Sequence, residues 1–238
     1  MTRSQFVEEL QQRIAKYDLL CHPFYQAWSA GELTRDDLRE YAADYYHHVA
    51  EFPNYLAEFF AHTGDPELRR AVLSNLNDEE GCDEGRPGRA HADLWLDFAA
   101  GMGADREEVR REAPPAYINE LTAFFHHVAT ESAPEAALAA FYAYESQVPR
   151  VAEAKARGLK ESYGADDAAC AYFTVHQTAD LAHSQVWLQQ LRKRVALDPA
   201  AMGTALQAAE AAAQKLWQAL DGVEHRRRQR QQAKAVPA

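Results

Sequence analysis

The sequence predicts an all-α protein, and three observations support this fold class. Apolar residues recur with the 3.6-residue period of an amphipathic helix along almost the whole chain, whereas the alternating pattern of strands is scarce. β-Branched residues, which favour strands, are sparse. The chain has 238 residues, of which 47% are apolar, so it can bury one sizeable core. We therefore expect a single helical domain over residues 1–224.

Individual helices follow from the periodicity and from local start and stop signals. Thr34 is a suitable N-cap for the RDDL segment, and Pro66 and Pro134 occupy first-turn positions. Glycines at 64, 81–88 and 164 mark breaks, and Pro53 and Pro149 lie inside long helical patterns that they should kink. The expected helices are 3–18, 22–29, 34–62, 66–80, 90–102, 105–112, 115–131, 134–163, 166–195 and 198–221.

The last segment, HRRRQRQQAKAVPA at 225–238, differs in composition from the rest of the chain. It is basic, polar and short of apolar residues, which is typical of a disordered, solvated tail. An arm that docks on a partner is the alternative.

Charge and cysteine content limit the function classes. A net charge of −11 argues against nucleic acid or an anionic membrane as the main partner. No window approaches 18 uninterrupted apolar residues, and the charged, amphipathic N-terminus is unlike a signal peptide. Cys21, Cys82 and Cys170 match no metal-binding pattern, so reduced thiols in a cytoplasmic protein are the simplest interpretation.

The segment HQTADLAH carries an unusual combination of side chains. In a continuous helix, His176, Asp180 and His183 would share one face over two turns. The flanking sequences AYFTV and SQVWLQQL are largely apolar, so this face should be partly buried. A buried face with two imidazoles and a carboxylate suggests metal ligands.

Other parts of the chain offer matching ligands. Glu145 lies within the apolar, aromatic segment FYAYESQVPR, and a buried carboxylate is rarely left without a partner. Glu79 ends one expected helix and His91 begins the next, so both can point to one spot. Carboxylates and imidazoles projecting inward from the helices of a bundle are the ligands of two-metal centres with iron or manganese.

Each feature also has a purely structural interpretation. A lone buried histidine is often only a hydrogen-bonded core residue, and Glu145 alone could pair with Arg150 or Lys155. The acids at 78–80 could form a solvated helix end. Taken together, the residues favour a metal site. The remaining histidines are interpreted as surface or packing residues: His22, His47, His48, His62, His126, His127 and His225.

Five segments in order carry a family resemblance: HPFYQAWSAGELT, YAADYYHHVAEFPNYL, NLNDEE, YAYESQVPRVAEAKARGL and YFTVHQTADLAH. With them the chain resembles, from about residue 10 to 220, the family of the Chlamydia protein associating with death domains and its bacterial relatives. The resemblance implies a haem-oxygenase-like bundle of seven helices. TenA-type thiaminases and the cofactorless oxidase of pyrroloquinoline quinone synthesis share this fold.

The resemblance also implies a non-haem dimetal oxygenase. Two metal ions, iron with iron or manganese with iron, would activate dioxygen with electrons from an external reductant. The loop before His91 is longer than in the family pattern, which leaves the first carboxylate open among Glu79, Glu80 and Glu84. The ligand pattern maps onto Glu79, His91, Glu145, His176, Asp180 and His183.

In this family the product is p-aminobenzoate, a folate precursor, thought to be cut from the protein's own tyrosine with a lysine as nitrogen source. The matching positions are Tyr25 and Lys155, and Tyr144 and Tyr172 match tyrosines that assist or carry a radical. Lys155 follows Glu145 by ten residues, about 15 Å along a straight helix. It can reach the site only if the helix breaks or bends at Pro149.

Three other functions compete with this one. A dimetal oxygenase or oxidase acting on an external small molecule would keep the ligands and make Tyr25 and Lys155 structural. A metal-free TenA-like hydrolase would need a reactive cysteine near paired acids, and a non-enzymatic interaction protein would need neither. The expected partners are dioxygen and an electron donor, and a homodimer is only the general expectation for soluble oligomers.

Overall fold

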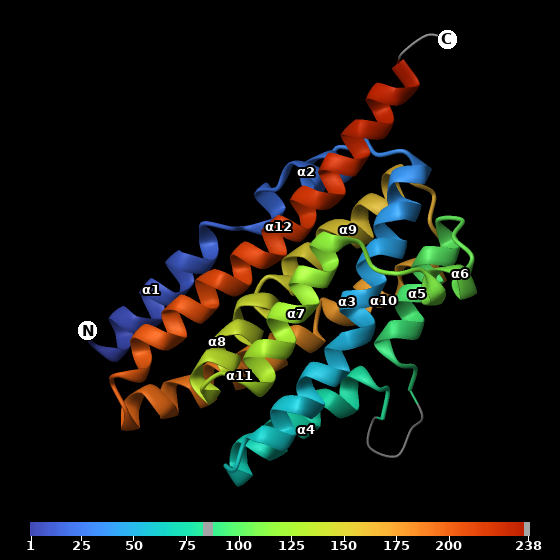
Figure 1. Cartoon of the computed structure of the whole chain (residues 1–238). Coiled ribbons are helices and arrows are strands. Elements are labelled where there is room, and N and C mark those ends of the chain that lie inside the picture. The colour runs from blue at the N-terminus through green and yellow to red at the C-terminus, as the bar shows by residue number, and fades with distance from the viewer. Residues whose placement is uncertain (83–87, 236–238) are drawn as a thin grey trace.

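The computed structural model describes residues 1–82 and 88–235. Regular structure within these residues is helical throughout, as predicted, and the longer helices lie beside one another in a bundle (Figure 1). None of the described helices is long and apolar enough to cross a membrane. The elements are α1 (Arg3–Ala15), η1 (Leu19–Cys21), α2 (Pro23–Ser29), α3 (Arg35–His62), α4 (Pro66–Glu79), α5 (His91–Gly101), α6 (Arg106–Arg111), α7 (Ala116–Thr130), α8 (Pro134–Glu145), α9 (Val148–Ser162), α10 (Asp167–His176), α11 (Ala179–Leu197) and α12 (Ala201–Ala235).

Helix α8 lies at the centre of the bundle. Every residue from Ala136 to Glu145 is buried, because this helix is apolar on all sides and packs against α7, α9, α11 and α12. The small alanines of the EAALAAFYAYE segment allow these close approaches. The chain thereby carries Glu145, at the end of α8, into the interior.

The single helix predicted over 134–163 is two helices, so that prediction was wrong. Helix α8 ends at Glu145 and α9 begins at Val148, with Pro149 in its first turn. Proline has no N–H to continue the hydrogen-bond ladder, so the predicted kink is a complete break. The buried Gln147 fills the gap, since its amide donates to the Ala143 carbonyl at 3.2 Å and accepts from the Leu19 N–H at 3.0 Å.

The single helix predicted over 166–195 was also wrong. Helix α10 ends at His176 and α11 begins at Ala179, and the Thr178 N–H closes a tight turn on the Val175 carbonyl at 3.2 Å. The connecting residues include neither glycine nor proline, so no local signal marks this break.

The prediction of a disordered tail from 225 was wrong as far as residue 235, because α12 continues to Ala235. Its basic side chains pair with acids on the first half of α3. Arg226 reaches Asp44 at 2.7 Å, and Arg230 reaches the buried Asp37 at 3.0 Å. Residues 236–238 lie outside the described part of the chain.

We expect Arg230→Met to lower the free energy of unfolding by about 1–3 kcal/mol, because it removes the guanidinium partner of a buried carboxylate. Asp37 is only 4% exposed. Lys234→Met is the matched control, since its pair with Asp36 is exposed and should contribute less than about 1 kcal/mol. Denaturant titration measures both. Equal losses in the two variants would contradict this account of the segment.

Candidate functional site

The six predicted metal ligands lie together as two groups of three. Within each group the ligand atoms lie within 4.8 Å of one another, and all six residues are buried. A small cavity of about 10 Å³ has walls from both groups, so the groups adjoin. The first ligand group is Glu79, His91 and His176, and the second ligand group is Glu145, Asp180 and His183.

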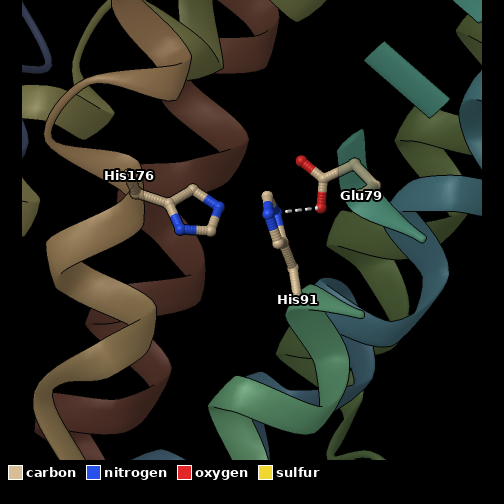
Figure 2. A group of neighbouring side chains, drawn as sticks. All are labelled: Glu79, His91 and His176. Carbon is tan, nitrogen blue, oxygen red and sulfur yellow. Dashed lines mark ion pairs between the residues drawn. The ribbon is translucent and has the colours of Figure 1, made fainter. Parts of the chain in front are cut away.

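The first ligand group is built where three helix ends meet, as Figure 2 shows. Glu79 ends α4, His91 begins α5 and His176 ends α10. The His91 Nδ1 lies 2.8 Å from a Glu79 carboxylate oxygen. Burial acts to raise the pKa of Glu79, but His91 outweighs it and holds that pKa below its usual value. Two histidines with one carboxylate form the ligand set of many non-haem iron oxygenases.

The structure distinguishes among the acids near the start of this loop. Glu79 is buried, which contradicts the solvated-end interpretation for this residue, whereas Glu80 caps the helix and is exposed. Glu84, the third alternative for the first carboxylate, lies outside the described residues. Of the two described alternatives, only Glu79 faces the other candidate ligands.

The second ligand group joins the end of α8 to the first turns of α11. The Asn75 amide donates to one Glu145 oxygen at 2.8 Å, and the Trp187 indole donates to the other. The alternative of an ion pair from Glu145 to Arg150 or Lys155 was therefore wrong. Burial, followed by the charge of Asp180, raises the pKa of Glu145 well above its usual value.

The helix break after His176 divides the HQTADLAH residues between the two groups. His176 faces the first ligand group, whereas Asp180 and His183 face the second. The prediction that all three share one face of a continuous helix was wrong. The break lets one short segment supply ligands to both positions.

Two buried ligand atoms of the second ligand group, Asp180 Oδ2 and His183 Nδ1, have no hydrogen-bond partner among the described residues, whereas His91 Nδ1 in the first group faces the Glu79 carboxylate. Unpaired buried polar atoms are costly, so the two in the second group fit a bound cation, and the first group offers the same kinds of ligand atom. Outer contacts fix the imidazoles. The His176 Nδ1 donates to the Tyr172 carbonyl at 2.8 Å and the His183 Nε2 to Asp78 at 2.8 Å. The other nitrogen of each ring stays free for a metal, as in known metal sites.

A second buried cluster contains Tyr25, Tyr41 and Lys155. The Lys155 Nζ lies 2.8 Å from the Tyr25 hydroxyl and also hydrogen-bonds the Tyr41 hydroxyl, and the two hydroxyls lie 3.0 Å apart. Lys155 is only 5% exposed, so it lies in the core and not at the surface. The break at Pro149 redirects α9 so that Lys155 points to Tyr25 on α2.

The surroundings of Lys155 favour its neutral amine. Burial lowers its pKa well below the usual value, and no described carboxylate lies in contact with its Nζ. The three hydrogen bonds among Lys155, Tyr25 and Tyr41 also favour the neutral amine. An ammonium would donate to both phenols, and since only one of these phenols can then donate to the other, a hydroxyl proton would be left unpaired. A neutral amine donates to one phenol and accepts from the other, which closes the ring.

Tyr144 and Tyr172 stand between the lysine cluster and the ligand groups. Both line the small cavity at the ligands and also a second cavity, of about 30 Å³, beside Tyr25 and Lys155. The Tyr172 ring stacks on His176 with 4.0 Å between centroids. The sequence resemblance placed both tyrosines next to ligands, and their positions agree with that.

Four residues with direct contacts to the site were missed in the sequence: Tyr41, Asn75, Asp78 and Trp187. Two carried a usable signal, because Asn75 precedes Glu79 by four residues and Trp187 follows His183 by four, so each shares a helix face with a candidate ligand. Asp78 and Tyr41 carried none, since their partners lie far away in the sequence.

Comparison with known proteins agrees with the geometry. The chain is 38% identical to the 4-aminobenzoate synthase of Chlamydia pneumoniae, over 81% of this chain and 84% of that protein. It is 36% identical to the 4-aminobenzoate synthase of Nitrosomonas europaea, over 94% and 92% of the two chains. A domain of unknown function from Shewanella denitrificans with a haem-oxygenase-like fold superposes with a TM-score of 0.79 at 16% identity, over 97% of this chain and 95% of that one.

The likeness to the Shewanella structure shows the fold. The similarity to the two synthases agrees with the family resemblance that the five sequence segments carry. Residues 39–217 match the family described as iron-containing redox enzymes. The chain therefore belongs to the haem-oxygenase-like family of iron-containing redox enzymes, and within it is related to proteins named 4-aminobenzoate synthase.

Proposed function

We propose that this enzyme is a dimetal oxygenase that makes p-aminobenzoate from its own Tyr25 side chain, with Lys155 as the nitrogen source and dioxygen as the oxidant. One observation carries the proposal: the Lys155 Nζ lies 2.8 Å from the Tyr25 phenol oxygen in a buried cluster. The similarity to two proteins named 4-aminobenzoate synthase supports the identity of the product.

The chemistry of the product explains why this contact matters. To turn a tyrosine side chain into p-aminobenzoate, the phenol oxygen must be replaced by nitrogen. The Cα–Cβ bond must also break, with Cβ oxidised to a carboxylate. The Lys155 Nζ lies against the oxygen to be replaced and 4.2 Å from the ring centroid. Fixed proximity of this kind removes the entropic cost of bringing the two groups together.

The ligand groups would hold the two metal ions, iron with iron or manganese. When bound, these ions supply the activation of dioxygen, with electrons from an external reductant, that side chains alone lack. The protein's own residues position and isolate the reaction. Asn75 and Trp187 orient Glu145, and the Tyr144 and Tyr172 rings separate the ligands from Tyr25.

The size of the cavity beside Tyr25 supports an internal substrate. Pockets for small-molecule substrates have volumes of roughly 300–1,000 Å³. The cavity bounded by Tyr25, Lys155, Tyr144 and Tyr172 has about 30 Å³, which leaves no room for a separate aromatic substrate. An oxygenase acting on an external molecule would need this region to open.

The direct test is intact and peptide mass spectrometry on metal-loaded, reduced protein before and after exposure to dioxygen. We expect the Tyr25 peptide to lose its side-chain mass, the Lys155 peptide to change, and p-aminobenzoate to be released at no more than one per chain. Anaerobic and metal-free samples are the controls. An unchanged chain that holds two metals and consumes dioxygen would contradict the proposal.

The state of Lys155 predicts an unusual pH dependence. A solvated lysine has a pKa near 10.4, so the fraction of free amine falls about tenfold for each pH unit below that value. Burial lowers the pKa of Lys155 well below it, which favours the amine at lower pH. We therefore expect the rate of p-aminobenzoate formation to fall by much less than tenfold per unit between pH 9 and pH 7. Metal content measured at each pH is the control, and a tenfold fall per unit at constant metal content would refute the neutral amine.

A further inference from the structure

The proposed chemistry leaves the cavity beside Tyr25 without a role of its own. Its volume of about 30 Å³ is enough for two water-sized atoms, because one such atom needs roughly 10–15 Å³ by this kind of measure. Its lining residues are all buried. The cavity therefore suits a molecule of two heavy atoms.

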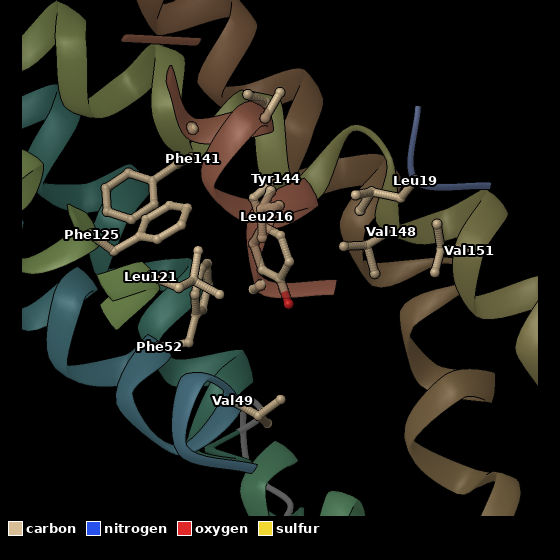
Figure 3. Close-up of a cluster of buried hydrophobic side chains, with 14 of the residues drawn as sticks. Leu19, Val49, Phe52, Leu121, Phe125, Phe141, Tyr144, Val148, Val151 and Leu216 are labelled. Atoms are coloured by element: carbon tan, nitrogen blue, oxygen red, sulfur yellow. The ribbon is translucent and has the colours of Figure 1, made fainter. Parts of the chain in front are cut away.

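The walls of the cavity are mainly apolar. Leu19, Val148 and Val151 form one side, and Figure 3 shows these three side chains near one another, with Tyr144 facing them. Ala152, Trp95 and Phe173 add further apolar surface. A buried space with mainly apolar walls stays dry and takes up apolar guests such as xenon.

The polar groups at the Tyr25 end of the cavity are paired with one another. The Tyr25 hydroxyl and the Lys155 Nζ bond each other and Tyr41. A buried water needs two to four free polar partners, so this end of the cavity gives a water molecule little to bind.

We propose that this cavity is a holding site for dioxygen, a non-polar diatomic gas. It touches Tyr25 on one side and, through Tyr144 and Tyr172, borders the cavity at the metal ligands on the other. The identity of the gas rests on the proposed function, whereas the preference of the cavity for an apolar guest does not. Oxygen stored here is available next to both the ligands and the side chain to be oxidised.

Xenon tests the cavity without metal or turnover. Crystals of the metal-free wild-type chain under xenon pressure should show xenon among Leu19, Val151 and Ala152. Ala152→Leu fills the cavity and should abolish this binding, and Ala152→Val is the milder variant if leucine prevents folding. Ala156→Val is the matched control, because Ala156 lies one turn further along α9, is also buried and does not line the cavity. It should retain the xenon.

The dependence of the reaction rate on dioxygen concentration tests whether the cavity holds dioxygen. With reduced, metal-loaded protein, Ala152→Leu or Ala152→Val should raise the half-saturating dioxygen concentration several-fold, with two metals still bound, whereas Ala156→Val should not. An ordered water in place of xenon would overturn the apolar site. Xenon binding with unchanged oxygen dependence in the filled variant would overturn the assignment to dioxygen. Failure of the proposed function appears separately, as oxygen consumption by the wild type without loss of the Tyr25 side chain.

Discussion

Tyr25→Phe is expected to reduce p-aminobenzoate formation to background while both metals remain bound. Phenylalanine lacks the oxygen that Lys155 contacts at 2.8 Å, so the exchange of oxygen for nitrogen has no starting point. The ring itself fits, because Tyr25 packs among Phe24, Tyr41 and neighbouring aromatic side chains. Product assay, metal analysis and thermal unfolding together separate a chemical defect from a folding defect.

Tyr41→Phe is the matched comparison for this prediction. Tyr41 is also buried and also forms a hydrogen bond with Lys155, so contact with the amine alone does not distinguish the two tyrosines. Only Tyr25 of the pair lines the cavity that borders Tyr144 and Tyr172. We therefore expect Tyr41→Phe to slow the reaction but to leave a product and a cleaved Tyr25. Loss of product in Tyr41→Phe with full product in Tyr25→Phe would reverse the assignment.

Lys155→Met tests whether Lys155 supplies the nitrogen of the product. Methionine keeps much of the apolar volume and removes the amine from the aromatic surroundings of Tyr25 and Tyr41. Formation of p-aminobenzoate should cease, whereas oxygen uptake and metal content should persist. Undiminished product would show that nitrogen comes from elsewhere.

The sequence predicted which residues lie together at the candidate site better than it predicted how the helices bring them there. Glu145 was identifiable because a carboxylate inside an apolar, aromatic helix needs a partner, and this reasoning is local. The position of Lys155 could not be predicted in this way, because it depends on how far the chain turns at Gln147 and Pro149. Periodicity predicts that a helix exists, but it carries no information about that angle.

Two other failures have a common physical cause. The break between His176 and Ala179 has no glycine or proline, so tertiary contacts and not local propensity end α10. The basic segment after residue 224 is polar by composition, yet it is helical because α3 offers carboxylates at matching positions. The end of α10 and the helical C-terminal segment both depend on contacts with residues distant in the sequence. A single sequence does not show which distant residues are in contact.

If each ligand group holds one metal ion, as proposed, Glu145→Gln and Glu79→Gln are each expected to reduce bound metal from two ions per chain to one, because each removes a carboxylate from a different ligand group. Glu80→Gln, at the exposed neighbour of Glu79, should keep both metals and is the matched control. Metal analysis after anaerobic loading measures this. Loss of metal in Glu80→Gln, with retention in Glu79→Gln, would show that Glu80 and not Glu79 is the ligand.

The same Glu145 variant should behave in the opposite way without metal. Glu145 is a buried carboxylate that faces Asp180, and burial together with the charge of Asp180 raises the pKa of Glu145, so its removal should stabilise the metal-free chain by about 1 kcal/mol. The glutamine amide can be accommodated, since the Asn75 oxygen has no partner and a flip of that amide presents it. Metal should then raise the Tm of the wild type more than that of the variant, because each site occupied at a hundred times its Kd adds about 2.7 kcal/mol. A metal-free variant much less stable than the wild type would instead assign Glu145 a structural role, and the carboxylates would need another explanation.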